Sequence, residues 1–500
     1  MKKTKFITGL LVTVLLTLAL ALPAVAQVEP PVVPPVVEAE LEPGESMTLT
    51  KGVTTPLIPP NPDIYFLCDT TGSMGPIIAA MQANAGAILA AVVAAQPSAQ
   101  FGVGAYQDFP IPASSPFCYE NRQSITSDTA AVQAAIDGWT LCWGGDGPEG
   151  QFYALDRLAE GTGIGWRGIG TKIVVWFGDA PAHDPVPMAA TGLGYDITEA
   201  TVTNDLVAAG IKVIAISWDS GAPSPYRLGL DDDPNVAGGD YAAAYGTIED
   251  GSLGQASRIA AETGGAYLFA ATPEEAVEAV LVGIEQLTTD VWWEVVDCDP
   301  GLTVTLEPAV HYDVPGDTTV QFEETITLAE DAPQCETLTG KVIFYANEYP
   351  EEGVVIGEQE ISIHVADITP PCVACREWVN PHGKVPPAGW TTAPGTNPNS
   401  GRNPDGFYQL GVWDNCDPDP MIYVTEWPSG VVFGPFPHGT TVKITEDPDA
   451  VPVCKKMGSS RGRAGRVDWH IILRTDAAIW GVDASGNAGS VLCLVPPPPK

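Results

Sequence analysis

Basic residues are scarce in this 500-residue chain. It has 23 lysines and arginines against 62 aspartates and glutamates, which leaves a formal net charge of −39 at pH 7. Proteins that bind nucleic acid neutralise its phosphates with lysine and arginine, so this composition argues against DNA or RNA as a partner. The acidity instead favours solubility and attracts cations.

Familiar catalytic motifs are also missing. The sequence has no G-x-S-x-G, no H-E-x-x-H and no phosphate-binding P-loop. His183 stands four residues after Asp179 and could act as a base on metal-bound water, which would make the chain a metal-assisted hydrolase. A histidine at the rim of a site with no chemical role is the more usual case. We therefore expect no enzyme.

An uncharged, apolar stretch that is almost long enough to span a membrane lies near the N-terminus. Three lysines precede an apolar stretch at 6–22, and Ala24-Val-Ala26 follows as a small-residue cleavage site. This order is typical of a secretory signal peptide at 1–26, with an uncleaved anchor as the alternative. Residues 494–500 form a Pro-rich tail without a hydrophobic segment. We expect a secreted, extracellular or cell-surface protein with no stable membrane insertion after cleavage.

The rest of the chain divides by its hydrophobic period. Residues 27–62 read as a Pro-rich linker, within which 38–58 alternates like strands. Strand and helix patterns alternate over 63–290, which predicts a doubly wound parallel α/β sheet. Residues 291–368 and 369–493 show strand patterns only and predict two β-sandwich modules. If 38–58 pairs with 291–368, the α/β part is inserted between strands of the first sandwich.

Ten cysteines in an exported chain favour disulfides. Cys68 lies inside a predicted buried strand, so we expect a free, packed thiol there. Cys298 and Cys335 fall together in the second region. The last region holds an odd number of cysteines, so one is free or pairs elsewhere: Cys372, Cys375, Cys416, Cys454 and Cys493. A zinc site at the C-x-x-C pair is disfavoured because no second ligand pair follows at the right spacing.

An apolar strand that ends on an acid is the most informative local pattern. Asp69, Thr71 and Ser73 follow the predicted strand at 64–68 and place a carboxylate and two hydroxyls at its carboxyl end. Hard divalent cations prefer oxygen ligands of this kind. Open α/β sheets bind ligands at this edge. The alternative is that Asp69 and Ser73 only cap the following helix.

Two further acids belong to the same predicted edge. Asp179 follows the apolar strand at 172–177, and Glu149 lies in a Gly- and Pro-containing loop before a helix. Together with Asp69 they form a cluster of carboxylates that would repel one another and raise their pKa values. A divalent cation removes that conflict. Few acids and two hydroxyls leave room for water or an outside carboxylate in an octahedral shell, which suits Mg²⁺ or Mn²⁺.

Three separated segments resemble a known family. Residues 69–74 resemble the metal-ion-dependent adhesion site of von Willebrand factor A and integrin I-like domains. The loop from Asp146 through Pro148 and Glu149, and the segment ending at Asp179, resemble corresponding segments of the integrin β-subunit I-like branch. The resemblance covers 63–290 and implies a Rossmann-like fold. It also implies a set of metal ligands: Asp69, Thr71, Ser73, Glu149 and Asp179.

A second cation, Ca²⁺, is implied more weakly by the same resemblance. Asp108, Asp146 and the Pro148 carbonyl would hold it, with Glu149 shared between the two sites. An exposed Asp108 without a metal is an equally good reading. The family also has a cystine-containing loop near this position, which implies a Cys118–Cys142 disulfide that would stiffen the rim of the site. A disulfide that only stabilises the fold is the alternative.

The last region resembles immunoglobulin-like hyalin repeats through its 414–419 and 483–487 segments. Its acidic loop at 414–419, like the one at 231–235, could bind Ca²⁺, but a solvated loop is favoured.

For the whole chain we expect a non-catalytic adhesion or ligand-binding protein that binds a carboxylate-bearing protein or glycan through its metal. A structural surface or matrix protein with a stabilising metal is the alternative, and the hydrolase is less favoured.

Overall fold

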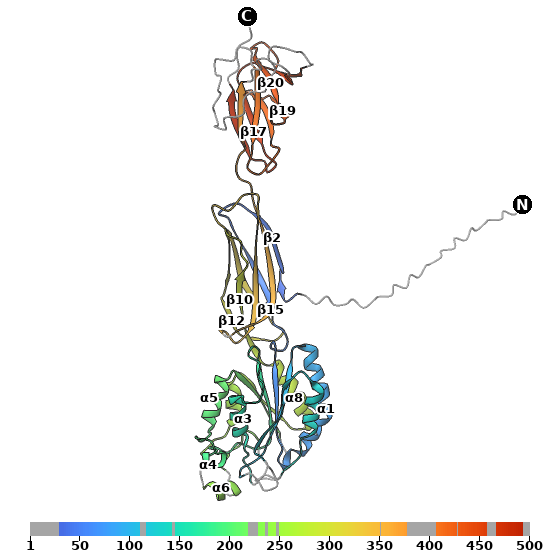
Figure 1. The fold of residues 1–500 in the computed structure, drawn as a ribbon, viewed down its shortest axis with the longest axis vertical. Coiled ribbons are helices and arrows are strands. Elements are labelled where there is room, and N and C mark those ends of the chain that lie inside the picture. The colour runs from blue at the N-terminus through green and yellow to red at the C-terminus, as the bar shows by residue number, and fades with distance from the viewer. Residues whose placement is uncertain are drawn as a thin grey trace, which may run out of the picture.

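The computed structural model describes residues 30–110, 117–142, 146–218, 229–235, 239–246, 250–350, 352–377, 407–427, 429–457 and 467–493. The predicted signal peptide and the Pro-rich tail lie outside these residues. The protein is multidomain and rich in strands. Figure 1 shows three parts stacked end to end: an α/β part at the bottom, a first sandwich in the middle and a C-terminal β domain at the top.

A six-stranded sheet forms the centre of the α/β part, in the order β6-β5-β4-β7-β8-β9. Every pairing is parallel except that of β6 with β5. The prediction of a fully parallel sheet is therefore wrong at this edge, where β6 runs back antiparallel to β5. The strands are β4 (Asp63–Asp69), β5 (Gln100–Tyr106), β6 (Tyr119–Thr126), β7 (Lys172–Gly178), β8 (Ile211–Trp218) and β9 (Ala266–Ala270).

Helices cover both faces of this sheet (Figure 1). One core cluster lies under α1 (Gly75–Ala95), α2 (Thr129–Asp137) and α8 (Pro273–Glu285). The other lies under α3 (Gln151–Glu160), α5 (Glu199–Ala208) and α7 (Gln255–Glu262). Every residue of β4 and β8 is buried, as expected for central strands covered on both sides. Short helices complete this part: η1 (Gly72–Met74), α4 (Met188–Thr191) and α6 (Asp240–Tyr245).

The segment Gly72–Ala95, which contains α1, is long and apolar enough to cross a membrane by length and composition. Its side chains Ile77, Met81 and Leu89 are buried in the core under the sheet. Packing inside the α/β part accounts for its apolar character.

The first sandwich is built from both sides of the α/β part in sequence. β3 pairs antiparallel with β13 over nine residues, and β2 pairs parallel with β15. These are the pairings that an inserted α/β part requires. β1 and β2 begin before residue 38, so the strands of the sandwich start earlier in the Pro-rich segment than the alternation at 38–58 predicts. The strands are β1 (Val32–Val33), β2 (Val36–Leu41), β3 (Ser46–Thr54), β10 (Thr288–Val296), β11 (Leu302–Glu307), β12 (Val310–Pro315), β13 (Thr319–Leu328), β14 (Thr337–Asn347) and β15 (Val354–Val365).

A buried ion pair joins the two chain segments of this sandwich. Lys51 Nζ on β3 lies 3.6 Å from Glu324 Oε2 on β13, and both side chains are fully buried. Lys51 also donates to the Pro34 carbonyl at 2.6 Å, and Gln359 donates to Glu324 at 2.9 Å. Burial lowers the pKa of Lys51 to about 8. Neither ion has water as an alternative partner, so each depends on the other.

Two further sheets pack face to face in the C-terminal β domain, in the orders β16-β17-β20-β22-β21 and β19-β18-β23-β24. The Cys375–Cys493 disulfide closes the domain, so Cys375 is unavailable to zinc. The strands are β16 (Cys372–Glu377), β17 (Phe407–Trp413), β18 (Met421–Glu426), β19 (Val432–Phe436), β20 (Thr441–Glu446), β21 (Val453–Lys456), β22 (Trp469–Leu473), β23 (Ala477–Val482) and β24 (Ala488–Cys493).

A second disulfide, Cys335–Cys416, joins the first sandwich to the C-terminal β domain. Cys416 of the last region thus pairs with a cysteine of the first sandwich, and Cys298 stays a free thiol. Cys372 and Cys454 are also free, so the expectation of a single odd cysteine in the last region is wrong. The predicted free, buried thiol of Cys68 is confirmed. Two disulfides among the described residues are consistent with an extracellular or cell-surface location.

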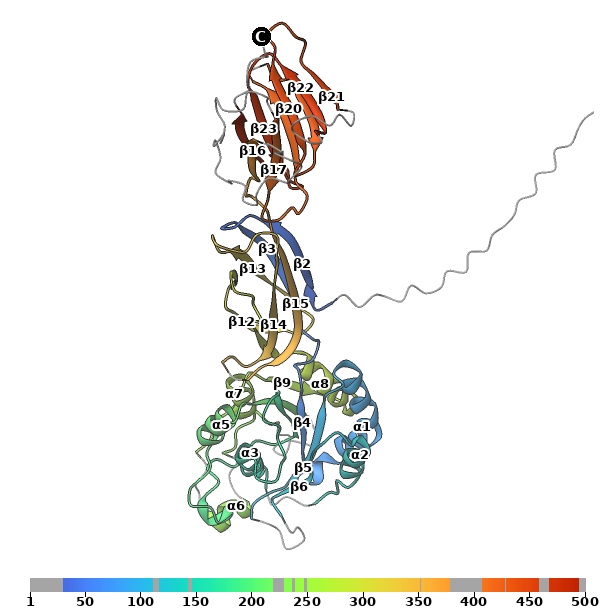
Figure 2. The ribbon, with the colours of Figure 1, turned by 45° about the horizontal axis from the view of Figure 1, so that its top comes forward.

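The α/β part meets the first sandwich at the amino ends of its strands. The chain enters β4 directly from the sandwich, and Gln96 at the end of α1 donates to the Ile58 carbonyl in that connection. The carboxyl ends of β4 and β7 therefore face the far end of the molecule (Figure 2). α1 has 21 residues, so this edge is about 30 Å from the junction.

Candidate metal centre

The first predicted ligands lie where β4 ends. Asp69 is fully buried, and its Oδ1 accepts a hydrogen bond of 2.7 Å from the Thr71 amide. This turn carries the chain from the strand into η1 and α1. The other Asp69 oxygen, Oδ2, and the Thr71 hydroxyl Oγ1 are buried without a hydrogen-bond partner. Burial, and next the neighbouring Asp179 carboxylate, raises the pKa of Asp69 well above its usual range.

A hydrogen bond between Ser73 and Asp179 connects the turn after β4 to the end of the neighbouring strand, β7. Ser73 Oγ donates to Asp179 Oδ1 at 3.0 Å, which holds the start of α1 against the end of β7. Asp179 is only 4% exposed, and burial raises its pKa to about 6. Ser73 is therefore not a simple helix cap, because its hydroxyl binds a side chain 106 residues away. The helix-capping alternative thus fails for Ser73, whereas the Asp69 bond to the Thr71 amide is a local contact at the start of η1.

Glu149 reaches the site from the loop before α3. Its amide donates to the Pro181 carbonyl, and its own carbonyl accepts from the His183 amide, so the loop is paired with the segment after β7. The Glu149 carboxylate is buried, and its Oε2 has no hydrogen-bond partner. Burial, and then the charges of Asp108 and Asp69, raise the pKa of Glu149 well above its usual range.

This loop needs glycine at position 150. A Cβ there would lie 2.4 Å from Cys118 Sγ and 2.7 Å from the Gln107 carbonyl oxygen. The close approach of the loop to β5 is what brings Glu149 towards Asp69.

The side chains at this site offer carboxylate and hydroxyl oxygens, which are the ligands that a hard divalent cation prefers. Asp69, Thr71 and Glu149 each present a buried oxygen without a hydrogen-bond partner, and such groups are costly to bury unless something binds them. The carboxylates of Asp69, Glu149 and Asp179 are more widely spaced: they do not offer three oxygens that all lie within 4.8 Å of one another. A cation here would therefore need the two hydroxyls or water in its shell.

A tighter cluster lies beside these residues. Asp108, Asp146 and His183 each offer a ligand atom, all within 4.8 Å of one another. His183 Nε2 lies 2.9 Å from Asp108 Oδ1 and 3.5 Å from Asp146 Oδ1. The His183 ring stacks on Tyr241 with 3.6 Å between ring centroids. The histidine thus lies between the two carboxylates for which the family resemblance weakly implies a second cation.

Several expectations about this neighbourhood are corrected. His183 is fully buried, so it is not a rim histidine, and Asp108 is fully buried too, so the reading of an exposed acid is wrong. The only feature of the sequence that points to His183 is its position four residues after Asp179. Pro148 is buried next to Glu149. Cys118 is a free, buried thiol whose nearest acceptor is the Gln107 carbonyl, so the Cys118–Cys142 disulfide is absent.

Comparison with known proteins gives a limited match. No family model matches the chain. A stretch of 75 residues is 35% identical to the integrin beta chain pat-3 of Caenorhabditis elegans, covering 15% of this chain and 9% of that protein. The chain therefore contains an integrin-like stretch, and it spans less than a tenth of the curated relative that it matches.

Solved structures give broad but loose matches. The pilus adhesin SpaC from Lactobacillus rhamnosus GG is 13% identical with a TM-score of 0.30, over 90% of this chain and 59% of SpaC. The conserved hypothetical protein BatB from Bacteroides thetaiotaomicron is 12% identical with a TM-score of 0.27, over 44% of this chain and 96% of BatB. Scores this low support no functional inference.

Proposed function

We propose that this chain is an adhesion-type binding protein. In this proposal its α/β part has a von Willebrand factor A-like, Rossmann-like fold of the integrin β-subunit I-like branch. Mg²⁺ or Mn²⁺ is held by Thr71, Ser73 and Glu149, with Asp69 and Asp179 acting directly or through water. The ligand is a protein or glycan with an exposed carboxylate.

The observation that carries the proposal is the group of buried oxygens without hydrogen bonds on Asp69, Thr71 and Glu149. Asp69 and Thr71 follow β4, Glu149 comes from the loop before α3, and the charge of Asp69 acts on the Glu149 carboxylate. Open α/β sheets bind ligands at the edge where β4 ends. The weak integrin beta match agrees with this choice. Mg²⁺ in such a site, when bound, supplies a positive centre whose water ligands a partner's carboxylate can replace.

The position of this edge suits a binding role. It lies at the end of the molecule away from the first sandwich and the C-terminal β domain (Figure 2). Ser73 is exposed there, whereas Asp69 and Glu149 are buried beneath it. A partner would thus meet the hydroxyl side of the site first.

A non-catalytic role is preferred over the hydrolase. A base must reach the water or substrate that it deprotonates. His183 is fully buried and lies between Asp108 and the Tyr241 ring, so its Nε2 is engaged inside the protein.

Calorimetric titration of Mg²⁺ into metal-stripped residues 27–500 tests the site. We expect saturable binding that Asp179→Ala abolishes and that Asp250→Ala, at an exposed carboxylate of the same part, retains. Equal binding in all three proteins, or none in any, would refute the metal site.

The ligand is tested separately, by comparing binding of acidic peptides in Mg²⁺ and in chelator. Peptides with Asp or Glu should bind only in Mg²⁺, and their Asn or Gln counterparts should not. If Mg²⁺ raises stability while no acidic ligand binds, the structural surface-protein alternative replaces the adhesion role.

A further inference from the structure

Three aspartates from separate segments meet where the first sandwich joins the C-terminal β domain. Asp367 follows β15, Asp414 follows β17, and Asp483 follows β23. Each offers a carboxylate oxygen, and the three oxygens lie within 4.8 Å of one another. Two oxygen ligands of one Ca²⁺ ion, each about 2.3–2.6 Å from it, can be up to about 5 Å apart. The spacing therefore fits a shared calcium ion.

Each carboxylate is held by one oxygen only. Asp414 Oδ1 accepts from the amides of Cys416 and Asp417, both at 2.8 Å. Asp483 Oδ1 accepts from the Asn487 amide at 2.8 Å, and Asp367 Oδ1 accepts from the amide two residues on at 3.1 Å. These turns orient the carboxylates and leave their second oxygens for another partner.

The second oxygens have no such partner in the described part of the chain. Oδ2 of Asp367, of Asp414 and of Asp483 is in each case buried without a hydrogen bond. Asp483 as a residue is only 6% exposed. The ion pairs of the described residues involve none of the three. Three carboxylates this close, with no cation, would repel one another and lack the solvation they lose on burial.

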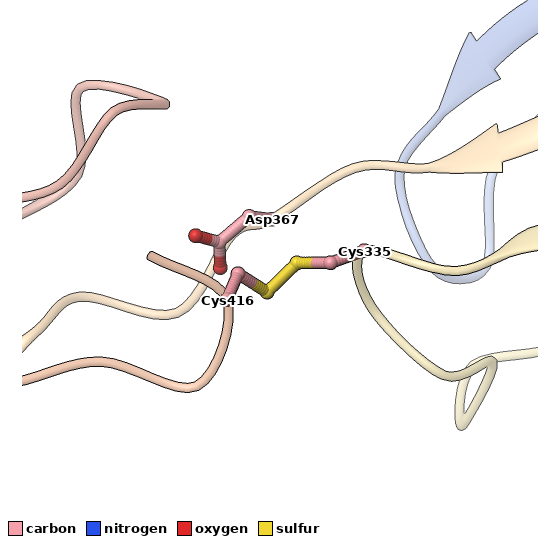
Figure 3. Close-up of side chains that lie close together, drawn as sticks. All are labelled: Cys335, Asp367 and Cys416. Atoms are coloured by element: carbon pink, nitrogen blue, oxygen red, sulfur yellow. A yellow bond between two sulfur atoms is a disulfide. The ribbon is translucent and has the colours of Figure 1, made fainter. Parts of the chain in front are cut away.

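The surroundings tie the cluster to the joint between domains. Asp367 lies beside the Cys335–Cys416 disulfide that links the two domains (Figure 3). The sulfur atoms are bonded to each other, so they are not thiolate ligands. The Asn487 side chain donates to the Asp367 carbonyl at 2.8 Å, and the Ala484 amide donates to Asp417 at 2.8 Å. The loop after β23 thus contacts both the interdomain connection and the loop after β17.

We propose that Asp367, Asp414 and Asp483 bind a Ca²⁺ ion at this junction, which fixes the orientation of the C-terminal β domain on the first sandwich. Ca²⁺ is preferred over Mg²⁺ because it accepts several carboxylates in a flexible shell, whereas Mg²⁺ demands near-ideal octahedral geometry and keeps its waters. The site is independent of the one proposed at Asp69. Of the three aspartates, only Asp414 lay in a loop that the sequence marked for calcium, because the other two come from distant segments.

Calcium titration of residues 27–500 by calorimetry tests the proposal. We expect Asp414→Asn and Asp483→Asn each to lose one Ca²⁺ equivalent relative to the unsubstituted protein. Asp419→Asn, at an exposed acid of the same loop, should keep it. Asp179→Ala should also keep it, which separates this site from the proposed adhesion site. The dissociation constant should be on the order of 10⁻⁴–10⁻³ M, as in other extracellular modules. Equal Ca²⁺ stoichiometry in all variants would overturn the proposal.

A second measurement does not depend on the variants folding. Limited proteolysis of the unsubstituted protein, read by mass spectrometry, should show cleavage at 366–371 after chelation and protection at about 10 mM Ca²⁺, well above the expected dissociation constant. Cleavage there that is indifferent to Ca²⁺ would refute the junction site. Mg²⁺ at the same concentration serves as the control and should protect much less.

Discussion

Replacing Asp179 by asparagine should have opposite effects on stability without and with Mg²⁺. The amide keeps an acceptor for the Ser73 hydroxyl but removes a charge that is buried beside Asp69 and Glu149. In the metal-free protein this charge opposes folding. With Mg²⁺ present, the same charge contributes to the site, so its loss should cost stability. A residue that only caps a helix would show no such reversal.

The size of the metal-free effect follows from the pKa of Asp179. Burial raises it from an ordinary 3.8 to about 6. The folded state then binds the proton more tightly than the unfolded state, so stability falls as pH rises from 3.8 to 6 and stays low above that. A shift of this size corresponds to ~3 kcal/mol at most. Metal-free Asp179→Asn should therefore be more stable at pH 7.5, and the difference should vanish near pH 4.

Thermal unfolding of the α/β part measures this reversal. Each kcal/mol should shift its midpoint by about 2–4 °C, the usual range for a part of this size. Saturating Mg²⁺, at about 1,000 times its dissociation constant, should stabilise the unsubstituted protein by about 4.1 kcal/mol and leave Asp179→Asn unchanged. This gain exceeds the ~3 kcal/mol that the substitution adds without metal, so the order of the two proteins reverses. Asp250→Asn, at an exposed carboxylate, should follow the unsubstituted protein throughout. If metal-free Asp179→Asn is the less stable protein, or gains equally from Mg²⁺, the reasoning is wrong.

Three other substitutions have calculable effects on stability, each measured by denaturant or thermal unfolding. Lys51→Met leaves Glu324 buried without its cation and should cost about 3–5 kcal/mol, much of which Lys51→Met with Glu324→Leu should recover; equal loss in both would refute the pairing. Gly150→Ala places a Cβ 2.7 Å from a backbone oxygen and should cost about 1–3 kcal/mol, whereas a neutral effect would mean that the loop is looser. Cys375→Ser opens the disulfide to Cys493 across 118 residues and should destabilise the C-terminal β domain by about 4 kcal/mol, with unchanged stability as the contrary result.

Local patterns account for the elements that were predicted correctly. The uncharged apolar runs predict β4 and β7, because a strand buried on both faces needs side chains of that kind throughout. Pro273 and the acids after it predict the start of α8, where Thr272 caps the helix. These signals depend on neighbours within a few residues, so they can be interpreted without knowledge of the tertiary fold.

The direction of a strand at the edge of a sheet is harder to predict from local sequence patterns. The run at β6 reads as a strand in either direction, and its antiparallel pairing with β5 depends on the connection between them. The pairing of Cys335 with Cys416 depends on how two domains meet, and its partners are 81 residues apart. The Cys118–Cys142 pairing was expected only from the family resemblance, and Cys118 is a free thiol.

The sequence by itself determined the acidic, strand-rich, multidomain character of this protein and placed acids at the ends of its buried strands. Only the tertiary structure decided which acids face one another. It put His183 between Asp108 and Asp146, and it brought Asp367, Asp414 and Asp483 to one point. The physical reason is range. Periodicity and turn chemistry act between near neighbours, whereas carboxylates interact through space over a few ångströms, wherever the packed domains place them.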